Sequence, residues 1–132
     1  MKEGVLDVVM TAHIINTKID SNYPATLSPN FLQNILRDKI GFEGVIVSDD
    51  MQMNAIASNY GFEEAVIRAI NAGCDILVIS NNSTSVYDDQ LPYKTIDVIN
   101  NAVKEGKISL EKINASYDRI IKLKKQFNII KN

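Results

Sequence analysis

The chain has 132 residues, of which 45% are hydrophobic, 23% charged and 7% aromatic, a length and composition that fit one soluble domain or part of a larger one. Fourteen basic residues against sixteen acidic ones give a net charge of −2 and no electrostatic basis for binding nucleic acid or an anionic membrane. One cysteine and one histidine exclude an internal disulfide and a Cys/His metal cluster; with no signal-peptide pattern and no apolar run near the roughly 20 residues of a membrane span, we expect a cytoplasmic protein.

Val5–Ile15 is the first of three segments that are almost continuously hydrophobic. Unbroken hydrophobicity is typical of strands covered on both faces, as in a parallel sheet flanked by helices. Ser28 as N-cap and Pro29 as first helical residue then predict the start of a helix, and Gly41 predicts its end. Gly44–Ser48 is the second hydrophobic segment, so this part of the chain indicates a strand–helix–strand unit.

The same order repeats in the second half. Apolar residues at helical spacing predict a helix over Phe62–Ala72, followed by a third strand over Cys74–Ser80 and a polar loop over 81–85. Two further helices are predicted, one at about Tyr93–Glu105 and a last one capped by Ser109.

Repeated strand–helix–strand units predict parallel strands joined by right-handed crossovers. A closed (β/α)₈ barrel takes eight strands and about 250 residues. The three predicted strands therefore correspond to about three-eighths of such a barrel, or to a very small open α/β domain.

Three segments lie toward or directly at the carboxyl ends of the predicted strands: Thr11–His13, Ser48–Met51 and Ser80–Asn82. Ligands bind beyond the carboxyl ends of parallel strands, in barrels and open sheets alike, so we expect these segments to converge on a site.

Asp49 and Asp50 directly follow a buried strand, where a carboxylate can be held rigidly against a ligand. Such a group suits nucleophilic attack on the anomeric carbon of a sugar, and equally Mg²⁺ ligation or acceptance of a phosphoryl group. In the alternative interpretation, one aspartate caps a helical turn over Met51–Ala57 and the other faces water.

Other side chains have both a structural and a functional interpretation. His13 is more often a hydrogen-bonded structural residue in such a position than a catalyst. Met53 is more often a packing residue than a ligand contact, although Met51 or Met53 could line the wall of a pocket. Cys74, between a glycine and a buried strand, is predicted to be a small core residue.

Several stretches together resemble a known family: Val9–Ile14, Pro24–Ser28, Leu36–Arg37, Gly41–Met51, Ala72–Leu77, Gly106–Ser109 and Ser116–Ile120. They are similar, in this order, to the C-terminal part of the catalytic barrel of glycoside hydrolase family 3, within it most of all to the bacterial β-N-acetylglucosaminidase branch. The resemblance covers nearly all of residues 1–132. It implies an α/β fold: a single-domain fragment of a (β/α)₈ TIM barrel with about the last three βα units plus the C-terminal helices.

The family's nucleophile is the aspartate directly after Ser or Thr in its Ser/Thr-Asp motif, and the matching position here is Asp49. The resemblance implies retention through a covalent glycosyl-enzyme intermediate, with no metal and no organic cofactor. The substrate class it implies is β-linked N-acetylglucosaminides, such as muropeptide fragments in peptidoglycan recycling. His13 and Met51 are secondary candidates for contacting the carbohydrate substrate.

The chain departs from the family in what it does not contain. In the resembled branch the acid/base is a histidine assisted by an aspartate on an upstream loop, and a Lys-His-Phe-Pro-Gly-His type motif binds substrate. Neither motif occurs here, and His13 does not match the histidine of that pair. We therefore expect a truncated gene product, an excised fragment or one half of a split enzyme. Its exposed sheet edges should make it self-associate or pair with the missing N-terminal part of the barrel, and alone it should have little activity.

Two alternatives stay open beside the hydrolase. One is a non-catalytic remnant that binds carbohydrate or assembles with another chain. The other is a small flavodoxin-like signalling domain that uses Asp49 and Asp50 for Mg²⁺ and phosphate. The second predicts acidic residues at the end of the first strand, where this chain has Thr11-Ala12-His13 instead.

Overall fold

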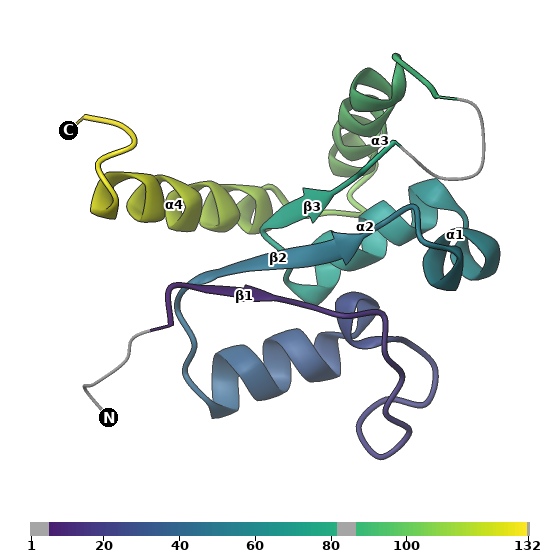
Figure 1. Ribbon diagram of the computed structural model, residues 1–132, viewed down its shortest axis with the longest axis horizontal. Coiled ribbons are helices and arrows are strands. Elements are labelled where there is room, and N and C mark those ends of the chain that lie inside the picture. The colour runs from purple at the N-terminus through teal and green to yellow at the C-terminus, as the bar shows by residue number, and fades with distance from the viewer. Residues whose placement is uncertain (1–5, 82–86, 132) are drawn as a thin grey trace.

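The computed structural model describes residues 6–81 and 87–131. Three parallel strands form one sheet in the order β1 (Val8–Met10), β2 (Val45–Asp50) and β3 (Ile76–Val78), as the sequence predicts. Figure 1 shows them side by side with their arrows pointing the same way, toward the side of the molecule where α1 (Asn54–Tyr60) lies. Strand order equals chain order, whereas a flavodoxin-like sheet begins 2-1-3, so the signalling-domain alternative does not fit this topology.

The helices follow the predicted alternation, with one difference in winding. The helix after Pro29, η2 (Asn30–Lys39), follows the 3₁₀ turn η1 (Ala25–Leu27) and is a π-helix, in which Ile40 N–H donates to the Ile35 carbonyl at 2.9 Å. The hydroxyl of Ser28 accepts the Phe31 N–H at 3.4 Å, so Ser28 does cap the first turn. Apolar spacing reports a helical face and cannot distinguish i→i+5 from i→i+4 bonding.

The later helices lie where the sequence predicts them, within a few residues. The helix α2 (Phe62–Ala72) has the predicted bounds, α3 covers Leu91–Lys104, and α4 covers Leu110–Gln126. Ser109 caps α4, as predicted, by accepting the Lys112 N–H at 3.3 Å. Of the predicted loop, only Asn81 lies within the described residues.

β1 and β3 are shorter than predicted because hydrophobicity continues beyond the paired residues, whereas β2 (Val45–Asp50) begins one residue later than the predicted Gly44–Ser48 and ends two residues later. β1 pairs only over Val8–Met10, after which the Thr11 N–H makes a last bond to the Val47 carbonyl at 2.8 Å. The chain then turns away, and the Ala25 N–H donates to the Ile14 carbonyl at 2.9 Å. The predicted residue Val5 lies outside the described residues.

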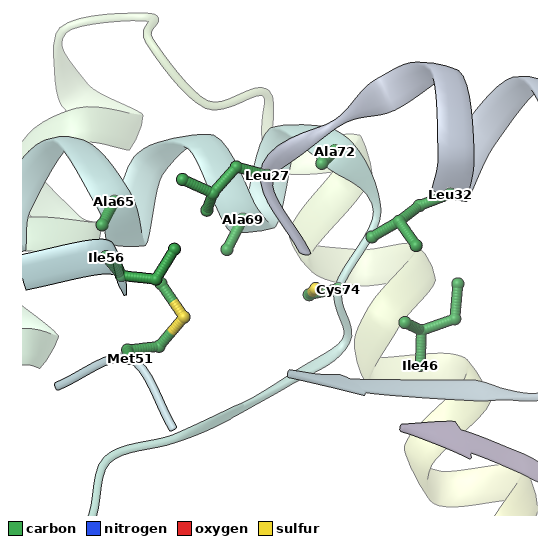
Figure 2. Close-up of a cluster of buried hydrophobic side chains, with 9 residues drawn as sticks. All are labelled: Leu27, Leu32, Ile46, Met51, Ile56, Ala65, Ala69, Ala72 and Cys74. Atoms are coloured by element: carbon green, nitrogen blue, oxygen red, sulfur yellow. The ribbon is translucent and has the colours of Figure 1, made fainter. Parts of the chain in front are cut away.

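Two buried clusters join the helices to the sheet, and α2 contributes to both. The larger one contains Leu27, Leu32, Ile46, Met51, Ile56, Ala65, Ala69, Ala72 and Cys74 (Figure 2). The second contains Val66, Ile70, Ala102 and Ile108. The alanines let α2 approach closely, and the 2% exposure of Cys74 confirms that it is a core residue.

A buried ionic network lies at the amino end of β3. The Asp75 side chain is 0% exposed and pairs with Arg37 of η2 at 2.7 Å and with Arg119 of α4 at 2.9 Å. It also accepts the Ile46 N–H at 2.8 Å and the Ser116 hydroxyl at 2.7 Å. One carboxylate therefore ties η2, α4 and β2 together, away from the carboxyl ends of the strands.

Among the described residues, no helix has the length and apolar character to cross a bilayer.

Candidate active site

The carboxyl ends of the three strands do converge, as the sequence predicts. The Asp49 N–H donates to the Thr11 hydroxyl at 3.3 Å, which joins the end of β2 to the end of β1. The Asp50 carboxylate accepts the Ser80 N–H at 3.1 Å, which joins the end of β2 to the segment after β3. Polar groups from three separate parts of the chain thus lie at one edge of the sheet.

The two aspartates differ in how much of each carboxylate is in use. Asp50 Oδ1 accepts the N–H groups of Gln52 and Ser80, each at 3.1 Å, and Oδ2 accepts the Ser80 hydroxyl at 2.5 Å. Burial acts to raise the pKa of Asp50, but the bonds from Ser80 and Gln52 outweigh it, so the pKa lies below its ordinary value. Asp50 is therefore the aspartate that caps the turn after β2.

Asp49 keeps an oxygen available. Its Oδ1 accepts the N–H of Asp50 at 2.8 Å, and within residues 6–81 and 87–131 its Oδ2 has no hydrogen-bond partner. The side chain is half-buried, and it is held at the sheet edge by its own backbone bonds. A half-buried carboxylate with one unengaged oxygen on a fixed backbone can act as a nucleophile or bind a cation.

The register of β2 against β3 changes at this position. Val47 pairs with Ile76 while Asp50 pairs with Val78, so β2 has one residue more than β3 over this interval. The extra residue makes a bulge at Ser48–Asp49. Bulges occur often next to active sites because they redirect a side chain out of the regular alternation. The hydrophobic pattern gave no sign of it.

Both ring nitrogens of His13 are bonded within the chain. Nδ1 lies 3.0 Å from the Thr26 hydroxyl, and Nε2 lies 2.9 Å from the carbonyl oxygen of Asp50. The ring also borders a hollow of about 440 Å³ whose other lining residues are Ile15, Pro24, Ala55, Asn59 and Tyr60. His13 is thus a hydrogen-bonded residue that presents the remainder of its ring to this hollow.

Met51 is 0% exposed and packs in the larger core cluster, where Figure 2 shows its side chain directed toward Ile56. The chain turns sharply after β2, with the Met53 N–H bonded to the Asp50 carbonyl at 3.1 Å, and this turn directs Met51 beneath the sheet edge. The expectation that Met51 contacts substrate is therefore corrected to a packing role.

Three residues at the site were not singled out from the sequence: Thr26, Ser80 and Gln52. Thr26 is fully buried, and its hydroxyl lies between the Thr11 hydroxyl and the His13 ring. Thr26 belongs to Pro24–Ser28, a stretch that resembles the family, and Ser80 ends the third predicted strand. The roles of both residues depend on hydrogen-bond partners that are distant in the sequence. A larger hollow of about 650 Å³ lies at the opposite end of the strands, against Leu6, Phe42 and Leu123, and is not part of this site.

Comparison with known proteins places this geometry in a family. The model of the glycosyl hydrolase family 3 N terminal domain matches residues 2–123. A beta-hexosaminidase of Tolumonas auensis is 47% identical over 79 residues, which cover 60% of this chain and 23% of that protein.

Solved structures agree with the sequence match. The family 3 beta-N-acetylglucosaminidase of Paenibacillus sp. str. FPU-7 superposes with a TM-score of 0.81 at 36% identity, covering 91% of this chain and 22% of that one. The beta-N-acetylglucosaminidase of Thermotoga maritima gives a TM-score of 0.75 at 35% identity, covering 87% of this chain and 24% of that one. The chain thus spans 22% to 24% of the length of these relatives. It is an α/β unit that matches part of their barrel domain, and it belongs to glycosyl hydrolase family 3.

Proposed function

We propose that this chain is the C-terminal part of a retaining β-N-acetylglucosaminidase barrel, its last three βα units plus the C-terminal helices, and that Asp49 is its nucleophile. One observation carries the assignment: of the two adjacent carboxylates, Asp50 is occupied by Ser80 and Gln52, while Asp49 keeps one oxygen that no other described residue engages. Asp49 also directly follows Ser48, as the nucleophile does in the family motif.

The reaction follows from this assignment. An Asp49 oxygen attacks the anomeric carbon, the bond to the leaving oxygen breaks, and a general acid donates a proton to that oxygen. Water, deprotonated by the same group, then attacks the glycosyl ester and releases the sugar with retained configuration and the carboxylate restored. Both bonds of His13 are made inside the chain, so it does not take the acid/base role, which we assign to the part of the barrel beyond this chain.

The substrate class that we propose is β-linked N-acetylglucosaminides, including muropeptide fragments of peptidoglycan recycling. The names of the solved relatives from Paenibacillus and Thermotoga support the glycoside, and the resemblance of the sequence supports the muropeptides. A cytoplasmic location and the independence from metal and organic cofactors stay predictions.

The partner that we propose is the remainder of such a barrel, added at β1. This strand is an outer strand of the described sheet, and large apolar side chains along it and its flanks are exposed: Leu6, Val8, Met10, Ile14 and Ile15. A parallel strand added there would continue the sheet in its existing order and cover these side chains.

The nucleophile is tested with a β-N-acetylglucosaminide of dinitrophenol, whose leaving group departs without a protonating acid. The substrate is given to the chain alone and to the chain mixed with the remaining barrel units of a relative, and intact-mass spectrometry follows. We expect one N-acetylglucosaminyl group on Asp49, none in Asp49→Asn, and an undiminished adduct in Asp118→Asn, an exposed aspartate on α4. Turnover by the chain alone should be slow because the acid/base is absent.

An equal adduct in Asp49→Asn would assign the chemistry to another residue. If no adduct forms with or without the added barrel units, and Asp49→Asn leaves saccharide binding unchanged, the results would favour a non-catalytic carbohydrate-binding remnant.

A further inference from the structure

Behind the two aspartates lies a continuous line of hydrogen bonds that the proposed chemistry does not use. The Thr11 and Thr26 hydroxyls are 2.8 Å apart, and Thr26 is 3.0 Å from His13 Nδ1. Thr11 and Thr26 are 9% and 0% exposed, so neither hydroxyl has ready access to solvent. At one end of the line Thr11 meets the Asp49 N–H, and at the other His13 Nε2 meets the Asp50 carbonyl.

The two ends determine the direction of every bond. A carbonyl oxygen only accepts, so His13 Nε2 carries the proton, and in the neutral ring Nδ1 must then accept. Thr26 therefore gives its one hydroxyl proton to Nδ1, and Thr11 in turn must donate to Thr26. The remaining oxygen lone pair of Thr11 accepts the Asp49 N–H. Each donor is used once and no donor is left over.

From this arrangement we infer that Thr11, Thr26 and His13 are positioning residues for Asp49. Thr11 holds the N–H of Asp49, His13 holds the C=O of Asp50, and Thr26 joins the two across η1. The Asp49–Asp50 dipeptide is thereby fixed at both ends, while the Asp49 side chain stays free to react. We call these three residues the Thr11–Thr26–His13 clamp.

The clamp matters for the reaction because it acts where β2 bulges. The register change of β2 lies in its pairing with β3, whereas Thr11 bonds the Asp49 N–H from the β1 side, so the clamp fixes the dipeptide beside the bulge, where β1 has ended. Displacement of a reacting group by about 1 Å can cost on the order of 100-fold in rate. The catalytic consequence rests on the proposed role of Asp49, whereas the bond directions do not.

The test uses ¹⁵N-labelled chain at about pH 8, where an ordinary imidazole is neutral. Long-range ¹H–¹⁵N spectra report which ring nitrogen of His13 carries the proton, and hydrogen exchange reports protection of the Asp49 N–H. We expect a single Nε2–H tautomer in the wild type. Thr26→Val should shift the Nδ1 resonance, because it removes the hydroxyl that donates to this nitrogen while the Asp50 carbonyl still holds the Nε2 proton, and Thr26→Ser should restore it. Thr95→Val, which removes another buried hydroxyl in α3, should change neither signal.

A second variant tests the direction of the line. Thr11→Val removes the hydroxyl that accepts the Asp49 N–H and donates to Thr26 but leaves the bond from Thr26 to His13 in place, so exchange of the Asp49 amide should speed up about tenfold while the His13 tautomer stays unchanged. In the mass-spectrometric assay, Thr26→Val should slow formation of the Asp49 adduct about tenfold or more, and Thr26→Ser should not.

A His13 proton on Nδ1 in the wild type would overturn the inference, as would a Thr26→Val chain with an unchanged Nδ1 resonance. Should the tautomer and amide results hold while Asp49→Asn leaves adduct formation intact, the clamp stands and the nucleophile assignment fails. The two proposals therefore have separate outcomes.

Discussion

Two neighbouring aspartates at the end of one strand differ in how their carboxylates are bonded. Asp50 accepts three bonds that stabilise its charge, whereas among the described residues Asp49 accepts one, from the Asp50 N–H. The difference comes from Ser80, which lies 30 residues further along the chain and supplies both an N–H and a hydroxyl to Asp50. Two residues of the same type therefore differ in how much of each carboxylate is engaged, according to which donors the fold brings to them.

The bonds to Asp50 predict an acid-sensitive contribution to stability. Because its pKa is lowered in the folded chain, the carboxylate stabilises the fold above its unfolded pKa of about 3.9, and this contribution is lost as pH falls through the folded pKa. Asp50→Asn should lower the free energy of unfolding by about 1–3 kcal/mol at neutral pH and by less at about pH 2.5. Urea denaturation across this range measures both, with the exposed Asp97→Asn as control. An equal loss at both pH values would contradict the prediction.

Cys74 illustrates the opposite case, a titratable group that burial inactivates. Burial, with a smaller contribution from Asp75, raises the pKa of the thiol to about 12. A maleimide added at about pH 8 should leave Cys74 unmodified in the folded chain and react rapidly once the chain is unfolded in urea. Mass spectrometry distinguishes the two, and fast modification without denaturant would show that this part of the core opens readily.

At the scale of elements, the Asp75 network decides how η2 and α4 attach to the sheet. One buried carboxylate serves two arginines from different helices, and Arg37 also donates to the Phe42 and Gly44 carbonyls at 2.9 and 2.6 Å. Removing the carboxylate leaves both guanidinium groups without their counter-ion in a largely dry place, which is the costly way to break a buried pair.

Asp75→Ala should therefore destabilise the chain by about 3–5 kcal/mol, measured by chemical denaturation. The matched control is Glu64→Ala, which breaks the exposed Glu64–Arg68 pair within α2 and should cost less than about 1 kcal/mol. Similar losses in the two variants would mean that the network contributes no more than a surface pair.

At the scale of the whole molecule, the outer strand β1 governs association. Exposed apolar side chains on an unpaired edge favour contact with another copy when no barrel partner is present. Light scattering should show self-association that Met10→Lys reduces. Ile96→Lys, at an exposed position on α3, should leave it unchanged. A strictly monomeric wild type at high concentration would contradict this, and displacement of the self-association by the remaining barrel units would support the partner that we propose.

The sequence by itself determined the parallel sheet, the bounds of α2, the cap at Ser109, the buried Cys74, the family and the place where the strand ends meet. The family follows from the ordered stretches that resemble it, and the other features depend on periodicity and capping within a few residues, which a linear pattern records. The sequence also narrowed the candidates for the reactive carboxylate to two aspartates, and only the family motif favoured Asp49.

Only the tertiary structure decided which aspartate is occupied, that Met51 is packed away from the site, and that both His13 nitrogens are bonded within the chain. Each depends on partners brought together by folding: Ser80 for Asp50, the sharp turn and Ile56 for Met51, and Thr26 for His13. The π winding of η2 and the bulge at Ser48–Asp49 belong here too, because they change hydrogen-bond register without changing the hydrophobic pattern. Bonds between residues far apart in the chain leave no local periodicity, so a linear sequence pattern does not predict them.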